Sequence, residues 1–360
     1  MTPPSITVLI TTYNYGRFIE EAIDSVLSQD FPSNQIGILV VDDGSTDDTS
    51  ERVKKYGPRI EYFYKPNGGQ ASALNFGFAK ARGEIVALLD ADDLFLPGKL
   101  ARVAAAFQHD PALGMVYHRL LEWHMRTDQR LDHHFVSVSG DLRAAPEQMF
   151  LFAPQPTSAI SFRRSSLRSL VPIPEHIRMM ADCYPVALIP FLAPILAIPE
   201  CLTVYRIHGK NSLPYFANAY LADESQMPIE TRKARLHLWQ IVIDAMRKWL
   251  TDNGFTRKQP AVRAFLDCWS LLFQQQQFLI DSPTRVRFFL FLLRQNYAYR
   301  SFQTWRFTLF NYLCAPLALG LGYKKTQLAY GFRLRAIETV QRWLGMVLRK
   351  RSTRYSEGGR

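Results

Sequence analysis

The chain has 360 residues, of which 48% are hydrophobic and 21% are charged. This length allows one large domain or two smaller ones, and the composition excludes a chain that is mainly disordered. The formal net charge of +11 is unevenly distributed: residues 1–220 carry 20 basic and 23 acidic side chains, whereas residues 221–360 carry 23 and 9. This asymmetry predicts two regions with different partners.

The N-terminus and the cysteines favour a cytoplasmic chain. The first residues, MTPPSITVLITTYN, lack the basic segment and the long apolar run of a signal peptide, so we expect a first strand there. The four cysteines have no metal-ligand spacing and are few for this length, which is typical of a reducing compartment.

Strands alternate with helices over the first 110 residues. Apolar runs predict strands at 6–10, 36–41, 60–64 and 85–89, and helical spacing predicts helices at 18–27, 46–55, 71–80 and 97–108. This alternation predicts a parallel sheet with right-handed crossovers. Neither a GxGxxG nor a GxxxxGK[ST] pattern is present, which disfavours a dinucleotide redox fold and a P-loop.

Polar residues follow three of these strands, where open α/β sheets place their ligands. Three carboxylates stand in four positions at Asp90-Ala91-Asp92-Asp93, directly after a buried strand. Carboxylates this close raise one another's pKa unless a cation lies between them. A divalent-metal site is therefore one interpretation, and a solvated acidic turn is the other. With Asp42-Asp43 on a neighbouring loop, the polar groups suit a metal-bridged nucleotide diphosphate.

Four segments in register, TTYN, VVDDGSTDDT, NGGQASALNFGF and LLDADD, resemble family 2 glycosyltransferases of the GT-A fold. The resemblance covers about residues 5 to 215. It implies a Rossmann-like, mainly parallel α/β sheet flanked by helices, a nucleotide-sugar donor and a divalent metal, Mn²⁺ or Mg²⁺. In this family the loop after the first strand and the second motif hold the nucleotide base.

The resemblance also implies roles for particular residues. It places Tyr13 against uracil, Asp42 as an acceptor from the base, and Asp92 as the best metal ligand with Asp93 beside it. The full nucleotide-binding set that it implies is Thr11, Tyr13, Asn14, Asp42, Asp43, Asn67, Asn75, Asp90, Ala91 and Arg206. Gly68-Gly69 either allows a ligand to approach the backbone or forms a plain turn.

The pattern between residues 111 and 220 is less regular. We expect strands at 114–124, 135–138 and 159–162, the last leading into a basic turn, Arg163-Arg164, near the active site. His133-His134 lacks a ligand partner at a metal-binding spacing, which favours a polar loop over a metal site.

Two further motifs in this region carry predicted chemistry. Asp182 stands in an otherwise apolar stretch, where it either caps a helix or is used functionally. The resemblance matches it to the catalytic base that deprotonates the acceptor hydroxyl. The YRxHxxN segment resembles the family segment that closes over the diphosphate, with Arg206 near the phosphates and His208 as a metal or phosphate contact.

The last 140 residues lie beyond the resemblance. An apolar stripe with flanking arginines predicts a helix near Trp239, and residues 307–323 form a span without formal charge. That span could be a buried hairpin, an interfacial helix or, less favourably because it is short, a transmembrane segment. The basic charge favours an anionic lipid surface over nucleic acid, since no reading module is recognisable.

These features predict three regions: a GT-A domain over 1–220, a basic helical extension over 221–348, and a disordered tail over 349–360. The expected function is inverting, metal-assisted transfer of a sugar, UDP-linked by preference, to a glycan or lipid-linked acceptor in surface polysaccharide synthesis. The expected location is the cytoplasm, with peripheral contact at the inner face of the plasma membrane. The alternative is a nucleotide-sugar-binding protein without turnover.

Overall fold

The computed structural model describes residues 5–132, 137–152, 155–209, 211, 229–281 and 284–299. Contacts divide the chain into two compact units, one ending at Phe273 and the other beginning at Gln274. This division falls well after the predicted boundary at residue 220. The predictions for His133-His134, for the span 307–323 and for the tail 349–360 lie outside the described residues.

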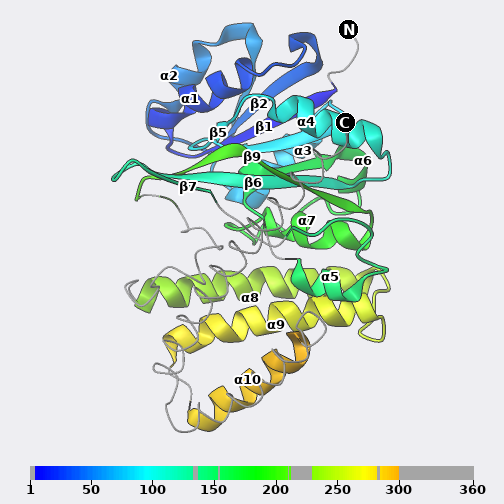
Figure 1. The fold of residues 1–360 in the computed structure, drawn as a ribbon. Coiled ribbons are helices and arrows are strands. Elements are labelled where there is room, and N and C mark those ends of the chain that lie inside the picture. The colour runs from blue at the N-terminus through cyan, green and yellow to red at the C-terminus, as the bar shows by residue number, and fades with distance from the viewer. Residues whose placement is uncertain are drawn as a thin grey trace, which may run out of the picture. The chain divides into compact units, whose positions relative to one another are not determined.

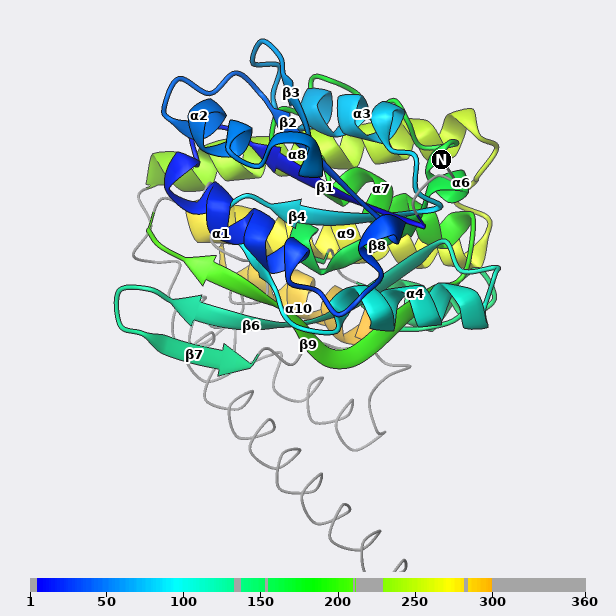
Figure 2. The same ribbon diagram turned by 90° about the horizontal axis from the view of Figure 1, so that it is seen from above.

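The first unit is built on one sheet of nine strands in the order β3-β2-β1-β4-β8-β6-β9-β5, with β7 paired to β6 (Figure 1 and Figure 2). The strands are β1 (Ile6–Thr12), β2 (Ile36–Asp42), β3 (Glu61–Tyr64), β4 (Ile85–Asp90), β5 (Leu94–Phe95), β6 (Met115–His124), β7 (Gln129–Asp132), β8 (Ile160–Arg163) and β9 (Ile195–Ile207). Strands β3, β2, β1 and β4 run parallel, and β8 continues the sheet antiparallel to β4. The predicted α/β class is confirmed.

Helices cover both faces of the parallel strands (Figure 2). They are α1 (Gly16–Leu27), α2 (Thr49–Lys54), α3 (Gln70–Lys80), α4 (Lys99–His109), α5 (Pro146–Leu151), α6 (Arg164–Leu167) and α7 (Cys183–Leu188). Helices α1, α2 and α4 pack on the face that carries Val8 and Ile10, whereas α3 and α7 pack on the face that carries Leu9. Because successive strand residues point to opposite faces, burial on both sides requires the unbroken apolar runs seen in the sequence.

The C-terminal helices confirm the predicted helical extension. Helix α8 (Ile229–Asp252) and the first part of α9 (Pro260–Ile280) join the core of the first unit, where the rings of Trp239 and Trp269 lie 5.2 Å apart. Helix α10 (Arg285–Tyr299) belongs to the second unit. Among the described helices, none combines the length and apolar character needed to cross a bilayer.

The sequence misplaced or missed several strands after residue 110. Of the predicted strand 135–138, the described part, Ser137-Val138, lies in no strand. The 13-residue strand β9 was not predicted, because Pro199 and Glu200 interrupt its apolar pattern. It pairs with β6 through register shifts beside Arg119, where β9 has extra residues, so the alternation of side chains is broken on β9.

Candidate active site

A cleft of about 680 Å³ opens at the carboxyl ends of the parallel strands. Its walls come from the ends of β1 and β4, the loop after β2, the start of α3, the segments 155–157 and 178–183, and single residues of β9 and α8. The predicted site residues that line it are Thr11, Tyr13, Asp43, Asn67, Asp90, Ala91, Asp92 and Asp182. Segments that are far apart in the sequence therefore meet in one cavity of a size typical for small-molecule sites.

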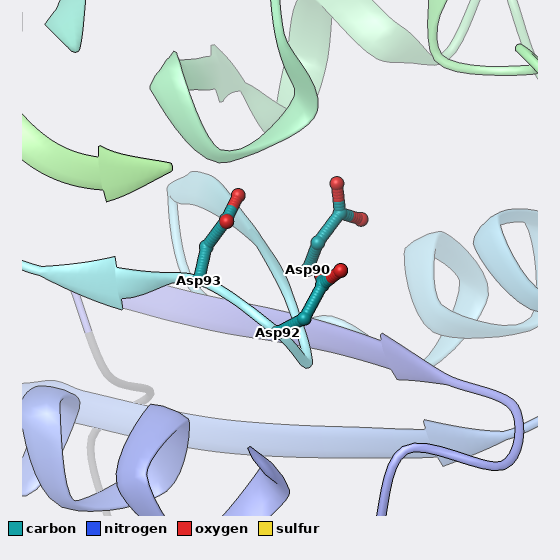
Figure 3. Close-up of side chains that lie close together, drawn as sticks. All are labelled: Asp90, Asp92 and Asp93. Carbon is teal, nitrogen blue, oxygen red and sulfur yellow. The ribbon is translucent and has the colours of Figure 1, made fainter. Parts of the chain in front are cut away.

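Asp90, Asp92 and Asp93 project from the turn after β4, and their potential ligand atoms lie within 4.8 Å of one another (Figure 3). Asp90 and Asp92 line the cleft, whereas Asp93 is fully buried behind it. Burial raises the pKa of Asp90 well above its usual range, and the neighbouring charges of Asp92, Asp93 and Asp182 raise it further. Such a cluster favours a bound cation because the cation offsets the repulsion.

The side chain of Asp93 is held in place by hydrogen bonds within the protein. Its carboxylate accepts a hydrogen bond from the Ser158 hydroxyl at 2.5 Å and another from the backbone N–H of Arg206 at 3.0 Å. The backbone N–H of Asp90 donates to the same Ser158 hydroxyl at 3.0 Å. Ser158 thus fixes two members of the acidic cluster relative to each other.

A buried lysine lies behind this turn. The ammonium group of Lys99 donates to the Ser158 carbonyl at 2.6 Å and to the Thr203 hydroxyl at 3.2 Å, and it lies 3.4 Å from the centre of the Phe95 ring. Burial lowers the pKa of Lys99 well below its usual value, while the charge of Asp93 opposes that shift. The ammonium group of Lys99 is therefore a buried basic group next to the acidic turn.

The structure does not place Arg206 or His208 on the cleft wall. The guanidinium of Arg206 is fully buried and donates to the backbone carbonyl of Asp92 and to the carboxylate of Glu21. His208 lies behind Asp92, with Nε2 3.0 Å from Asp92 Oδ2 and Nδ1 3.0 Å from a guanidinium nitrogen of Arg17. Both residues hold the acidic turn from behind.

Three predicted nucleotide-binding residues form hydrogen bonds within the protein. The carboxylate of Asp42 is fully buried and accepts from the Ser45 N–H at 2.7 Å and the Tyr62 hydroxyl at 2.8 Å. Asn75 exchanges two hydrogen bonds with the backbone of Ile173. Asn14 has a left-handed φ of 60°, and its side-chain oxygen accepts from the Thr46 N–H at 2.8 Å.

Asp182 lines the cleft and is 7% exposed. The Thr157 hydroxyl donates to its carboxylate at 2.9 Å. Burial raises the pKa of Asp182, and the hydrogen bond from Thr157 partly offsets that rise. Asp182 is the N-cap residue of α7 but forms no side-chain capping hydrogen bond there, and it lines the cleft.

The basic turn at Arg163-Arg164 was predicted near the active site, and the structure contradicts this. Arg163 pairs in register with Ile85 at the amino end of β4, and its guanidinium binds the carboxylate of Glu84. Because β8 is antiparallel to β4, the end of β8 lies at the edge of the sheet opposite the cleft. The sequence could not reveal this strand direction.

The sequence also missed some cleft residues. Gln70, Thr157, Arg178 and Tyr205 line the cavity with the predicted set. Of these four, only Gln70 and Tyr205 fall in segments that resemble family motifs, and neither was predicted to contact a ligand. Thr157 and Arg178 carry no local signal because their position depends on contacts with distant segments.

A mixed α/β sheet with an acidic cleft at its carboxyl edge defines the class of protein, the GT-A fold. Solved structures support this: a mannosyltransferase from Pyrobaculum calidifontis in complex with GDP-Man and Mn²⁺ is similar with a TM-score of 0.52 and 20% identity, over 92% of this chain and 85% of that one. S. aureus TarS 1-349 in complex with UDP gives a TM-score of 0.50 and 17% identity over 89% and 92% of the two chains.

Sequence comparison identifies the family. Residues 7–171 match the family described as Glycosyl transferase family 2. An uncharacterized glycosyltransferase of Nostoc sp. is 36% identical over 228 residues, which cover 61% of this chain and 70% of that protein. A second one, from Mycoplasma pneumoniae, is 42% identical over 116 residues, which cover 31% of this chain and 39% of that protein. The chain therefore belongs to glycosyltransferase family 2 and is a glycosyltransferase.

Proposed function

We propose that this protein transfers a sugar, with inversion, from a UDP-linked or related nucleotide donor to a hydroxyl of a glycan or lipid-linked acceptor. One observation carries the proposal: a buried carboxylate, Asp182, and two members of the acidic cluster, Asp90 and Asp92, line the same cleft. The first group suits a general base, and the other two suit a cation that binds a diphosphate.

The residues present fit a divalent cation. Asp90 and Asp92 offer carboxylate oxygens, which Mg²⁺ and Mn²⁺ prefer. The pKa of Asp90 is raised by burial and, in addition, by repulsion from neighbouring carboxylates, which a cation would relieve. We assign Asp92 and Asp90 as the ligands that face the cleft, with Asp93 as a third carboxylate behind them and His208 orienting Asp92. A bound cation would stabilise the charge that develops on the departing diphosphate.

The chain's own residues account for the remaining steps. The carboxylate of Asp182 takes the proton from the acceptor hydroxyl while the hydroxyl oxygen forms a bond to the anomeric carbon. The bond from that carbon to the diphosphate oxygen breaks, and attack from the face opposite the leaving group inverts the configuration. A raised pKa suits this role, since a general base works best with a pKa close to the operating pH.

The nucleotide is expected at the end of the cleft formed by β1 and β2. Tyr13 is 47% exposed at the cleft wall, so its ring is available to pack on a base. Thr11, Asp43 and Asn67 surround the same end. UDP is the first nucleotide to test, and GDP is the second because a structural neighbour was solved with GDP-Man.

The test is a screen of nucleotide-sugars for transfer and for thermal stabilisation, with and without Mn²⁺. A matching donor should raise the melting temperature and release the nucleoside diphosphate, because a ligand that binds the native state stabilises it. Asp182→Asn should bind the donor like wild type and lose transfer. A wild-type protein that binds donors without releasing diphosphate under any condition would support the binding-protein alternative instead.

Peripheral membrane contact is proposed for the second unit. Helix α10 exposes Val286 and Leu290, which are 60% and 57% accessible, and Arg287 and Arg294 are exposed on the same helix. Residues 285–299 contain no acidic residue, so the helix suits an anionic lipid surface. In a flotation assay, the wild type should float with vesicles that contain about 30% anionic lipid. Val286→Asp combined with Leu290→Asp should abolish flotation, and unchanged flotation would contradict the proposal.

A further inference from the structure

Arg178 is the only lysine, arginine or histidine among the described residues that line the cleft. Four carboxylates line the same cavity, those of Asp43, Asp90, Asp92 and Asp182. One of them, Asp43, is already paired with the ammonium of a neighbouring lysine at 2.6 Å. An anionic ligand that enters this cleft meets an excess of negative charge and a single guanidinium.

The backbone of Arg178 is held firmly against the start of α3. Its carbonyl oxygen accepts the N–H of Gln70 at 2.9 Å, and the Gln70 side chain accepts the N–H of Ala181 at 2.9 Å. Gly69 has a left-handed φ of 88°, and a Cβ at this position would lie 2.9 Å from the Arg178 Cα. Glycine is therefore required there for the 178–182 segment to pack so closely.

The side chain of Arg178 is exposed to the cavity but oriented. Its guanidinium donates to the side-chain oxygen of Asn67 at 2.6 Å, and the Asn67 amide donates to the backbone carbonyl of Asp43 at 2.9 Å. A guanidinium has five N–H donors in a planar fork, and this hydrogen bond uses one. The remaining donors can bind a ligand without an additional loss of side-chain freedom.

We propose that Arg178, oriented by Asn67, binds the diphosphate of the nucleotide-sugar donor. The inference rests on the proposed function, and it assigns the second charged contact of that donor. The diphosphate is the part of such a donor that is always anionic, and the carboxylates around it repel it. A planar guanidinium recognises phosphate oxygens in pairs, which a lysine ammonium does not.

The experiment measures nucleotide binding by titration calorimetry with Mn²⁺ present, using UDP, UMP and uridine, and GDP, GMP and guanosine. Arg178→Met is compared with wild type, with Arg178→Lys, and with the control Arg168→Met, which changes an exposed arginine outside the cleft. We expect Arg178→Met to weaken the diphosphate by about 10- to 100-fold, the range for hydrogen bonds to charged groups. Uridine or guanosine should bind within about twofold of wild type, and Arg178→Lys should recover only part of the loss.

Other results would overturn the inference. Unchanged diphosphate affinity in Arg178→Met, or an equal loss for the nucleoside, would assign Arg178 to another contact while leaving the proposed function intact. A wild-type protein that binds neither diphosphate would refute the proposed function and this inference together. The melting temperature of each variant separates lost binding from lost folding, and exposure of the side chain predicts that folding is retained.

Discussion

Removing one hydroxyl beside the proposed base should move the pH dependence of transfer. Thr157 is buried, and its hydroxyl donates to the Asp182 carboxylate at 2.9 Å. This hydrogen bond favours the ionised carboxylate and so lowers a pKa that burial raises. Thr157→Val keeps the size of the side chain but removes the donor, so the pKa of Asp182 should rise further.

The size of the shift follows from the bond. A hydrogen bond to a charged group contributes about 1.5–3 kcal/mol, and one pKa unit corresponds to about 1.4 kcal/mol. The expected rise is therefore about one to two units. Because the base must be deprotonated to accept a proton, activity is lost as pH falls through the pKa of Asp182. In Thr157→Val this loss should begin at a pH about one to two units higher, and the rate should recover at high pH.

The assay measures kcat/KM as a function of pH at saturating Mn²⁺, with release of the nucleoside diphosphate as the readout. Saturating metal matters because the Thr157 hydroxyl also lowers the pKa of Asp90. Thr157→Ser keeps the hydroxyl and should retain the wild-type profile. Thr251→Val, which removes an exposed hydroxyl on α8, should do the same. A rate that falls equally at all pH values, with an unmoved acid limb, would refute the assignment of Asp182 as the base.

Three further predictions concern the acidic turn. A carboxyl group whose pKa is raised in the folded state costs stability as pH rises from its unfolded pKa, 3.8, through its folded pKa. Without metal, Asp90→Asn should therefore lose less stability than wild type between acidic and neutral pH, as measured by urea unfolding. Identical pH profiles of the two proteins would contradict this. Arg206→Met should lower the free energy of unfolding by about 1–3 kcal/mol, because it removes the hydrogen bonds that the buried guanidinium donates to the Asp92 carbonyl and to the exposed carboxylate of Glu21. The exposed Arg82→Met should change it by under about 0.5 kcal/mol. Mn²⁺ should raise the melting temperature of wild type but not of Asp92→Ala, and a chelator should abolish transfer by wild type. Transfer that persists both in Asp92→Ala and in wild type with chelator would exclude the metal-assisted mechanism.

The local pattern was sufficient for the first half of the sheet. Runs such as Ile85–Leu89 are apolar at every position because both faces of the strand are buried, and β4 is found at Ile85–Asp90. The polar loops after β1, β2 and β4 meet because parallel strands end at the same edge. For this reason Thr11, Asp43 and Asp90 could be assigned to one cleft before the structure was known.

Side-chain direction was not available from the same pattern. Asp42 and Asp43 are adjacent, yet only Asp43 lines the cleft, since Asp42 is fully buried and bonded to Tyr62. Arg206 was expected near phosphates, but its guanidinium is buried behind the acidic turn. In each case, a hydrogen-bonding partner that is distant in the sequence decided the orientation.

By itself, the sequence determined the alternation of strands and helices, the position of the acidic turn and the carboxylate at Asp182, because these depend on local periodicity and residue type. Tertiary structure decided which of these groups share the cavity and what supports them. The backbone N–H of Arg206 binds Asp93 across 113 residues of chain, and the Thr157 hydroxyl binds Asp182 across 25. Such contacts form only when segments that are distant in the sequence pack together, so no local window of residues encodes them.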